Sequence, residues 1–386
     1  MANETLRTGL YASFLERFHK EPMLVRSPGR VNIIGEHTDY NDGFVLPAAI
    51  DKSIYVAVAK RDDATISLFS KEFNEAFEIN LNNLQRSEKQ WANYILGVVA
   101  QLQKKNYSLS GFELMIDGDV PIGAGLSSSA AVECATAFAL NELFQLKIDK
   151  LDMVKMAQKA EHEYAGVMCG IMDQFASMFG KADSVIQLDC RSLAYKYEPF
   201  KLEGIKIVLL NTNVKHSLAS SAYNERRQQC DEGAALVRKK YPDIINLRDV
   251  SLAMLDEIVA PADPLIYKRC RYVVEENQRL LDACAALEKG DLATLGQKMY
   301  DSHKGLSVEY EVSCKELDFL VDQVRHNSNV IGARMMGGGF GGCTINLVKE
   351  EGVDTLVKEL SVAYTDAMGK TLTAYIATIS SGTSIA

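Results

Sequence analysis

The sequence predicts an α+β protein of two domains. Its 386 residues, 47% of them apolar, exceed what one hydrophobic core usually supports. Residues 52–81 are rich in β-forming runs, so we expect a sheet early in the chain. Beyond residue 200, the pattern is mostly helical. We therefore expect a boundary near Phe200, with an N-terminal domain over residues 1–200 and a C-terminal domain over residues 201–386.

The first domain is expected to combine helices with a mixed sheet. Apolar side chains at helical spacing predict helices over residues 4–20, 91–104, 130–144, 148–164 and 166–178. Short β-rich runs predict strands over residues 23–26, 54–58, 65–69, 76–81 and 112–116, and a hairpin over 184–189 and 193–197.

The second domain is expected to be richer in helix. Asp263 and Asp291 each stand where they can cap a helix that follows. The predicted helices cover residues 220–240, 264–287, 291–303 and 352–364, and the predicted strands cover residues 204–210, 331–335, 343–348 and 371–376.

The overall charge and the cysteines narrow the class of protein. A net charge of -9, with no basic block to offset it, argues against a nucleic-acid-binding protein. The eight cysteines are scattered without a CxxC pair, which is typical of a reduced, cytoplasmic protein. The N-terminal segment has no continuous apolar run, so we expect neither a signal peptide nor a membrane span.

A glycine- and serine-rich stretch, residues 120–131, joins a predicted strand to a predicted helix. The first N–H groups of a helix have no intrahelical partner and carry partial positive charge, so this position suits the phosphates of a nucleoside triphosphate. The stretch lacks the lysine of a Walker A loop and the third glycine of a dinucleotide motif. A serine-capped helix that binds nothing is the alternative.

Residues 27–43 place an arginine, a glutamate, a histidine and two aspartates between a Pro-Gly and an Asp-Gly turn. A sugar needs such a density of polar groups, because an unpaired buried polar group costs about 1–3 kcal/mol. A solvated surface loop is the alternative.

Three further positions suggest chemistry. Glu161 lies in a predicted helix and can complement Ser129 as an oxygen ligand of Mg²⁺, although glutamates on helix surfaces are common. Asp173 stands inside an otherwise apolar helical pattern, which favours a functional role or an N-cap near Gly170.

The glycine run at residues 337–342 formally matches GxGxxG. A β pattern follows it, whereas a dinucleotide fold requires a helix there, so we reject that interpretation. We expect a tight loop between strands that packs against the active site of the first domain, or else a simple hairpin tip.

Three separated blocks together resemble the galactokinase branch of the GHMP kinase family. They are SPGRVNIIGEHTDYNDG at residues 27–43, PIGAGLSSSAA at 121–131 and MGGGFGGC at 336–343. The resemblance implies a two-domain fold with a left-handed βαβ unit and an active site in the cleft between domains. It also implies transfer of the γ-phosphoryl group of ATP to the anomeric hydroxyl of α-D-galactose, the first committed step of galactose use. We expect the enzyme to be a monomer.

The resemblance also implies a role for individual residues. Asp173 matches the catalytic aspartate, and Arg30 matches the arginine beside it. The sugar contacts correspond to Glu36, His37, Thr38, Asp39, Gly170 and Tyr223. The triphosphate cradle corresponds to Gly123, Ala124, Gly125, Leu126, Ser127, Ser128 and Ser129. Ser129 and Glu161 match the Mg²⁺ ligands, and Ser70 falls near the family's nucleotide site.

Two alternatives share these motifs. An N-acetylgalactosamine kinase would differ in the room beside C2 of the sugar. Some relatives instead sense galactose and ATP without turnover, and these can lack a Ser-Ala pair that residues 127–131 retain here. Kinases of homoserine or mevalonate lack the block Glu36-His37-Thr38-Asp39 in this form.

Overall fold

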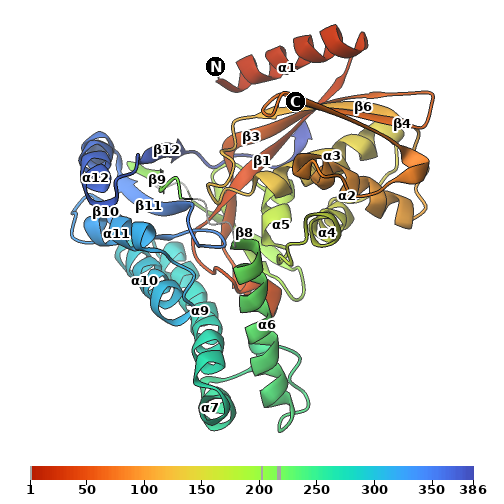
Figure 1. Cartoon of the computed structure of the whole chain (residues 1–386). Helices are drawn as coiled ribbons and strands as arrows, with labels where there is room; N and C mark the ends of the chain where they lie inside the picture. Colours follow the sequence, from red (N-terminus) through yellow and green to blue (C-terminus); the bar gives the residue numbers. More distant parts are fainter. Residues whose placement is uncertain (1, 201–202, 215–218) are drawn as a thin grey trace.

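The computed structural model describes residues 2–200, 203–214 and 219–386 (Figure 1). In these residues the strands form three sheets. The largest is mixed and has the strand order β13-β1-β3-β6-β4-β5. Strands β4 and β6 pair in parallel, and every other neighbouring pair in this sheet is antiparallel. The strands are β1 (Met23–Asn32), β3 (Pro47–Lys60), β4 (Thr65–Ser70), β5 (Glu75–Asn80), β6 (Phe112–Gly118) and β13 (Ser384–Ile385).

Helices cover both faces of this sheet. The first helix lies on one face, where Leu10 and Phe14 are buried against Tyr55 and Met115 (Figure 1). Four helices pack on the other face and enclose the main core of this half. The five helices are α1 (Ala2–Phe18), α2 (Gln90–Lys104), α3 (Ser128–Phe144), α4 (Lys150–Ala160) and α5 (Met172–Phe179). Between the parallel strands β4 and β6 the chain passes through β5 and then α2, and the left-handedness expected of this βαβ unit stays a prediction.

The second half has an antiparallel sheet with the order β10-β11-β9-β12, made of β9 (Ile205–Asn211), β10 (Val330–Met335), β11 (Cys343–Lys349) and β12 (Thr373–Ala377). Its helices are α6 (Ala219–Arg238), α7 (Leu252–Met254), α8 (Ala260–Ala262), α9 (Pro264–Glu288), α10 (Leu292–Lys304), α11 (Lys315–Val324) and α12 (Val353–Met368). A small third sheet joins β2 (Phe44–Val45), β7 (Ser184–Asp189) and β8 (Tyr195–Pro199).

The two halves share a hydrophobic core. Ile33 and Ile34, at the end of β1, lie in the same buried cluster as Leu209 of β9, Ile345 of β11 and Leu280 of α9. The sheet of the second half therefore packs directly against the residues that follow strand β1 of the first half. Shorter helical turns lie at Asp39–Asn41, Leu81–Asn83, Glu161–Ala165, Leu247–Asp249, Leu255–Val259, Gly305–Glu309 and Glu350–Gly352.

The end of the chain returns to the first sheet. Strand β13 pairs with β1, with Val25 opposite Ile385. Just before it, the backbone N–H and the hydroxyl of Thr383 both donate to the carbonyl of Ser177 in α5. The predicted boundary adjoins residues 201 and 202, which lie outside the described residues, so the division into domains stays a prediction.

Most of the expected elements are confirmed within a few residues. Asp263 and Asp291 cap α9 and α10 through their side chains. The predicted hairpin is formed by β7 and β8, and the glycine run joins the antiparallel pair β10 and β11.

Three expected elements are present but differ from the prediction in their bounds or helix type. The strand expected over residues 23–26 continues to Asn32, because Pro28 is accommodated at a register shift between Pro28 and Arg30. The helix expected over residues 148–164 ends at Ala160 and continues as a π turn, Glu161–Ala165, which Gly166 terminates at a φ of 79°. The helix expected over residues 166–178 begins only at Met172.

Asp173 consequently lies neither in a helix interior nor at an N-cap. Ile171 occupies the N-cap position, and Asp173 is in the first turn of α5. A carboxylate is favourable there because the first turn carries the positive end of the helix dipole. Helix α11 and strand β13 were not anticipated. The buried residues of α11, Leu317, Leu320, Val321 and Val324, do follow helical spacing.

Candidate active site

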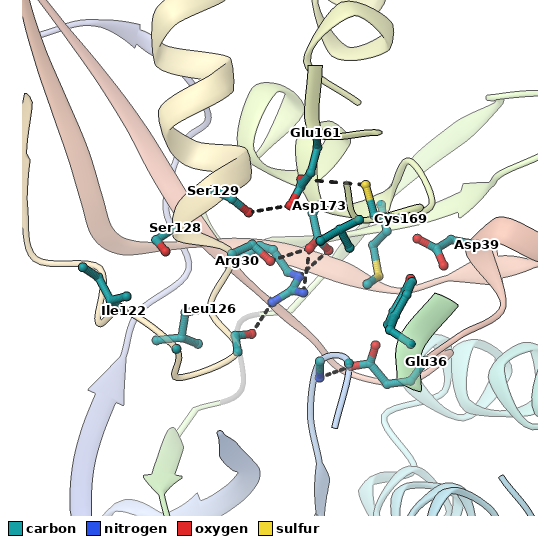
Figure 2. A pocket seen from close by; sticks show the side chains of 18 of the residues that line it. Arg30, Glu36, Asp39, Ile122, Leu126, Ser128, Ser129, Glu161, Cys169 and Asp173 are labelled. Atoms are coloured by element: carbon teal, nitrogen blue, oxygen red, sulfur yellow. Dashed lines mark hydrogen bonds and ion pairs between the residues drawn. The ribbon is translucent and has the colours of Figure 1, made fainter. Parts of the chain in front are cut away.

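A cavity of about 410 Å³ lies where the first sheet, α3, α5 and the glycine loop of the second half meet. Figure 2 shows its charged side chains pointing toward one another from separate elements. Thirteen residues expected at the site line it: Arg30, Glu36, His37, Asp39, Gly123, Gly125, Leu126, Ser127, Ser128, Ser129, Glu161, Asp173 and Tyr223.

Arg30 and Asp173 form a bidentate ion pair in the cavity. Nε of Arg30 donates to Oδ1 of Asp173 at 2.8 Å, and Nη2 donates to Oδ2 at 3.0 Å (Figure 2). Arg30 comes from β1, whereas Asp173 comes from α5, so the fold brings together groups that lie far apart in the chain. Burial lowers the pKa of Arg30, but the charges of Asp173 and Glu36 outweigh this and raise it overall. Arg30 is therefore positively charged at neutral pH.

The glycine–serine stretch wraps around this ion pair. Nη1 of Arg30 donates to the carbonyl of Gly125, and the hydroxyl of Ser127 donates to Oδ2 of Asp173. Gly123 and Gly125 have φ values of 77° and 76°, which glycine adopts without strain. Helix α3 begins at Ser128, and its first residues line the cavity. The backbone N–H groups of this first turn, which have no partner within the helix, therefore lie at the cavity wall.

The serines do not behave as the alternative of a capped helix requires. Ser127 occupies the N-cap position but, among the described residues, its side chain makes no capping bond to the helix. Its hydroxyl bonds to Asp173 instead, and the hydroxyl of Ser129 bonds to Oε1 of Glu161 at 3.0 Å (Figure 2). These serines therefore join the helix N-terminus to the acidic residues of the cavity.

Glu161 projects from the π turn and is largely buried. Burial, together with the charge of Asp173, raises its pKa to about 7. Gln174 donates from Nε2 to Glu161 at 2.8 Å and to Glu133 at 3.1 Å. Burial, together with the charge of Glu161, raises the pKa of Glu133 well above its usual range.

A cation would find two oxygen ligands here. Ser129 and Glu161 present oxygen atoms, which Mg²⁺ prefers, and Mg²⁺ commonly takes its other ligands from water and phosphates. No cluster of three or more histidine, cysteine, aspartate or glutamate side chains suited to a metal is found within residues 2–200, 203–214 and 219–386. The donor set thus fits an ion that arrives with a nucleotide rather than one held by protein alone.

The loop after β1 forms the opposite wall. Oε1 of Glu36 accepts from the backbone N–H of Gly337 at 2.8 Å and from Nη2 of Arg334 at 2.9 Å. Nδ1 of His37 lies 2.7 Å from the hydroxyl of Tyr40. Burial lowers the pKa of His37 to about 3, so its imidazole is neutral at physiological pH.

Asp39 is packed tightly against Gly170. A Cβ at position 170 would lie 2.0 Å from Oδ2 of Asp39, so any other residue would force the side chain of Asp39 to move. Burial raises the pKa of Asp39 to about 7, and the charges of Asp173 and Glu36 add to this shift. Tyr223, from α6, places its ring 5.1 Å from that of His37 and closes this side of the cavity.

Four of the expected residues do not line this cavity. Thr38 is buried, and its hydroxyl bonds to the carbonyls of Gly35 and Phe44. Ala124 is buried in the core shared by the two halves. Gly170 lies behind Asp39. Ser70, at the end of β4, lines a neighbouring cavity.

That second cavity has a volume of about 520 Å³ and adjoins the first. The two share Tyr94, Pro121, Ile122, Ser128 and Ser129 as lining residues. Its other walls are largely apolar and include Ile54, Phe73, Trp91, Ile116 and Val132. Trp91 is also buried in the main core, so it serves both as a packing residue and as part of this wall.

The glycine run supports the glycine–serine stretch, as expected. A Cβ on Gly125 would lie 3.2 Å from the carbonyl oxygen of Met336, and one on Gly337 would lie 3.3 Å from that of Gly125. The two loops therefore pack backbone to backbone, and Gly337 and Gly338 line the cavity. The expectation of a tight loop between strands at residues 337–342 is confirmed, and this loop packs against the glycine–serine stretch at the cavity.

Sequence reasoning missed Arg334, Gln174 and Tyr40. Arg334 offered the clearest signal, because it is a charged residue within a predicted apolar strand that leads to the glycine run. Gln174 and Tyr40 gave no signal of their own, since each contacts partners that only the fold brings near.

Family models and known proteins match this chain over most of its length. The model "Galactokinase galactose-binding signature" matches residues 12–60. The models "GHMP kinases N terminal domain" and "GHMP kinases C terminal" match residues 93–181 and 283–364.

Relatives agree with these models. The galactokinase of Roseiflexus sp. (strain RS-1) is 43% identical over 93% of this chain and 92% of its own. That of Thermotoga maritima is 44% identical over 90% and 95%. The crystal structure of Lactococcus lactis galactokinase complexed with galactose matches with a TM-score of 0.94 at 37% identity, over 98% of this chain and 99% of the other.

A more distant structure shares the fold alone. The mevalonate kinase of Methanococcus jannaschii matches with a TM-score of 0.65 at 19% identity, over 93% of this chain and 99% of the other. None of the described helices combines the length and apolar character needed to cross a membrane. With its signature, both kinase domains and the overall structure in agreement, the chain belongs to the galactokinases of the GHMP kinase family.

Proposed function

We propose that Asp173 and Arg30 are the catalytic pair of this galactokinase. The supporting observation is their bidentate ion pair, which lies between the helix N-terminus of α3 and the loop of residues 33–43. The reaction transfers the γ-phosphoryl group of ATP to the anomeric hydroxyl of α-D-galactose and yields α-D-galactose 1-phosphate and ADP. Such a transfer mainly requires that the reactants are held in line and that developing charge is neutralised.

In this mechanism, Asp173 accepts the proton of the anomeric hydroxyl. The bond between that oxygen and the γ-phosphorus forms as the bond from the γ-phosphorus to the bridging oxygen of ADP breaks. Arg30 and Ser127 hold the carboxylate of Asp173 in one orientation. Arg30 also places positive charge near the transferred group.

The sugar is proposed to bind on the side of Glu36, His37, Asp39 and Tyr223. These side chains line the cavity and offer carboxylate, imidazole and phenol groups to its hydroxyls. Thr38 and Gly170 would act indirectly. Thr38 fixes the loop through two backbone carbonyls, and Gly170 leaves the space that Asp39 occupies.

The triphosphate is proposed to bind along residues 123–129, at the N-terminus of α3. The adenine then has an adjoining place in the second cavity, among Ser70, Trp91 and Ile122. The apolar walls suit a flat heterocycle, which is commonly bound by hydrophobic and aromatic side chains.

Ser129 and Glu161 are the residues that would hold Mg²⁺. When bound, the ion would neutralise charge on the phosphates. Burial and the negative charge of Asp173 raise the pKa of Glu161 and so disfavour its ionised form. A bound cation would favour the ionised form and relieve this cost. Gln174, which also donates to Glu133, donates a hydrogen bond to Glu161 and so fixes its side chain.

One assay tests the proposed substrates. ADP release should be measured with galactose, N-acetylgalactosamine, glucose and mevalonate as acceptors, at saturating ATP and Mg²⁺. We expect turnover with galactose to dominate. Faster turnover with N-acetylgalactosamine would favour the kinase of that sugar, and binding of galactose and ATP without ADP release would favour a sensor.

Location and assembly are also proposals. Each of the eight cysteines lies in the described part of the chain and is free, which supports a reducing compartment such as the cytoplasm. We expect a monomer, and light scattering coupled to size-exclusion chromatography tests this expectation. A dimeric mass would contradict it.

A further inference from the structure

Arg334 is a buried cation in the wall behind the sugar side of the cavity. It lies on β10, and its side chain is 0% exposed. Each nitrogen of the guanidinium donates a hydrogen bond: Nε to the carbonyl of Ile33 at 2.8 Å, Nη1 to that of Met335 at 2.7 Å, and Nη2 to that of Asn32 at 2.6 Å. Nη2 also donates to Oε1 of Glu36 at 2.9 Å.

These bonds leave the two oxygens of Glu36 in different situations. Oε1 accepts from both Arg334 and the backbone N–H of Gly337. Among the described residues none donates a hydrogen bond to Oε2, although Glu36 lines the cavity. The backbone of Glu36 is fixed as well, since its carbonyl accepts from the hydroxyl of Tyr272 at 3.0 Å. Oε2 is therefore the oxygen left for a ligand.

Charge gives Arg334 a second effect on Glu36. Glu36 is 2% exposed, and it lines the same cavity as the carboxylates of Asp39 and Asp173. A buried carboxylate without a counter-charge would take up a proton or move toward water. Arg334 supplies that counter-charge from the side away from the cavity, through Oε1, so the cavity-facing oxygen Oε2 is left unoccupied by it.

We propose that Arg334 is a positioning residue for sugar binding: it holds Oε1 of Glu36 so that Oε2 accepts a hydrogen bond from a galactose hydroxyl. This inference depends on the proposed role of Glu36 as a sugar ligand. The planar fork of arginine is needed, because one lysine ammonium cannot reach three carbonyls and a carboxylate with the same geometry.

The test is a double-mutant cycle. Arg334→Lys, Arg334→Gln, Glu36→Gln and the double variant Arg334→Lys/Glu36→Gln should be assayed for kcat and for the KM of galactose and of ATP. We expect each single variant to raise the KM of galactose about tenfold, which is the typical effect of one lost hydrogen bond to a charged group, and to change the KM of ATP less than about twofold. The double variant should be no worse than Glu36→Gln alone, because Arg334 acts through Glu36.

Arg269→Lys is the matched control. Arg269 is also almost fully buried and also binds a carboxylate, that of Glu311, but it lies away from the cavity. We expect this variant to keep the KM of galactose. A general loss of packing would instead affect both variants alike.

Three results would overturn the inference. Effects of Arg334→Lys and Glu36→Gln that multiply in the double variant would show that Arg334 acts independently of Glu36. If circular dichroism shows that both Arg334 variants fail to fold while Arg269→Lys folds, Arg334 is required for folding, and its role in positioning Glu36 is refuted. An unchanged KM of galactose in Glu36→Gln would refute the sugar-binding role of Glu36 itself, which separates that failure from the first two.

Discussion

Replacement of Asp173 by asparagine tests the centre of the mechanism. Three donors converge on this carboxylate: Nε and Nη2 of Arg30, and the hydroxyl of Ser127. An amide has nearly the same shape but only one acceptor oxygen. If that oxygen takes the place of Oδ2, it keeps the bonds from Nη2 and Ser127, and Nε of Arg30 faces an NH₂ group. The variant therefore retains the position of the side chain but loses its charge and one bond.

The expected loss follows from these contacts. Removal of a general base typically lowers a rate by about 10²–10⁴-fold, which corresponds to about 2.7–5.4 kcal/mol in the activation barrier. The lost bond from Arg30 is charge-assisted and accounts for about 1.5–3 kcal/mol at most. We therefore expect kcat to fall by at least about 100-fold, with the affinity for ATP nearly unchanged.

The assay is steady-state ADP release, together with calorimetric titration of ATP. Asp63→Asn is the control, because Asp63 makes the same bidentate contact with Arg61 in a surface turn, at 2.8 Å and 2.7 Å. We expect that variant to keep full activity. Full activity of Asp173→Asn would refute both a base and an electrostatic role, whereas a loss smaller than about tenfold would favour a side chain that only orients the sugar hydroxyl.

Three further predictions concern other walls of the site. Glu161→Gln should raise the Mg²⁺ concentration needed for half-maximal activity at least about tenfold, because a charged oxygen ligand is lost. Glu163→Gln, in the same π turn, should leave this concentration unchanged. Equal effects of the two variants would contradict the assignment of Glu161 as a Mg²⁺ ligand. Gly170→Ala should raise the KM of galactose, because the new Cβ would displace Asp39, and Gly9→Ala, which meets open space, should not. For the protein without ligands, burial raises the pKa of Asp39 from 3.8 to about 7. Between about pH 4 and 7, the folded state therefore keeps a proton on Asp39 that the unfolded chain has already lost. The free energy of unfolding should therefore fall as pH rises through this window, by up to about 1.4 kcal/mol per pH unit from this group. Chemical denaturation should show a smaller fall for Asp39→Asn than for the unchanged protein. Identical pH profiles of the two proteins would contradict the raised pKa.

Much of the site could be predicted from local sequence. The glycine–serine stretch identified the helix N-terminus of α3, and the block at residues 27–43 supplied Arg30, Glu36, His37 and Asp39. Both features depend on residues close together in the chain. The caps at Asp263 and Asp291 were predictable for the same reason, since a cap bonds within its own first turn.

Features that depend on distant partners were not predictable in this way. Strand β1 continues through Pro28 because β3 accommodates a register shift opposite it. The π turn after Ala160 places Glu161 beside Ser129, a contact made across two helices. Arg334 gains its importance only when the ends of β1 and β10 meet.

The pairing of β13 with β1 separates the order of synthesis from the order of assembly. Val25 is translated long before its partner Ile385. Until then one edge of the N-terminal sheet has exposed N–H and carbonyl groups that can recruit another chain. We therefore expect nascent chains of this enzyme to need protection by chaperones at that edge, and a ribosome stalled before residue 384 to display an N-terminal half that is not yet closed.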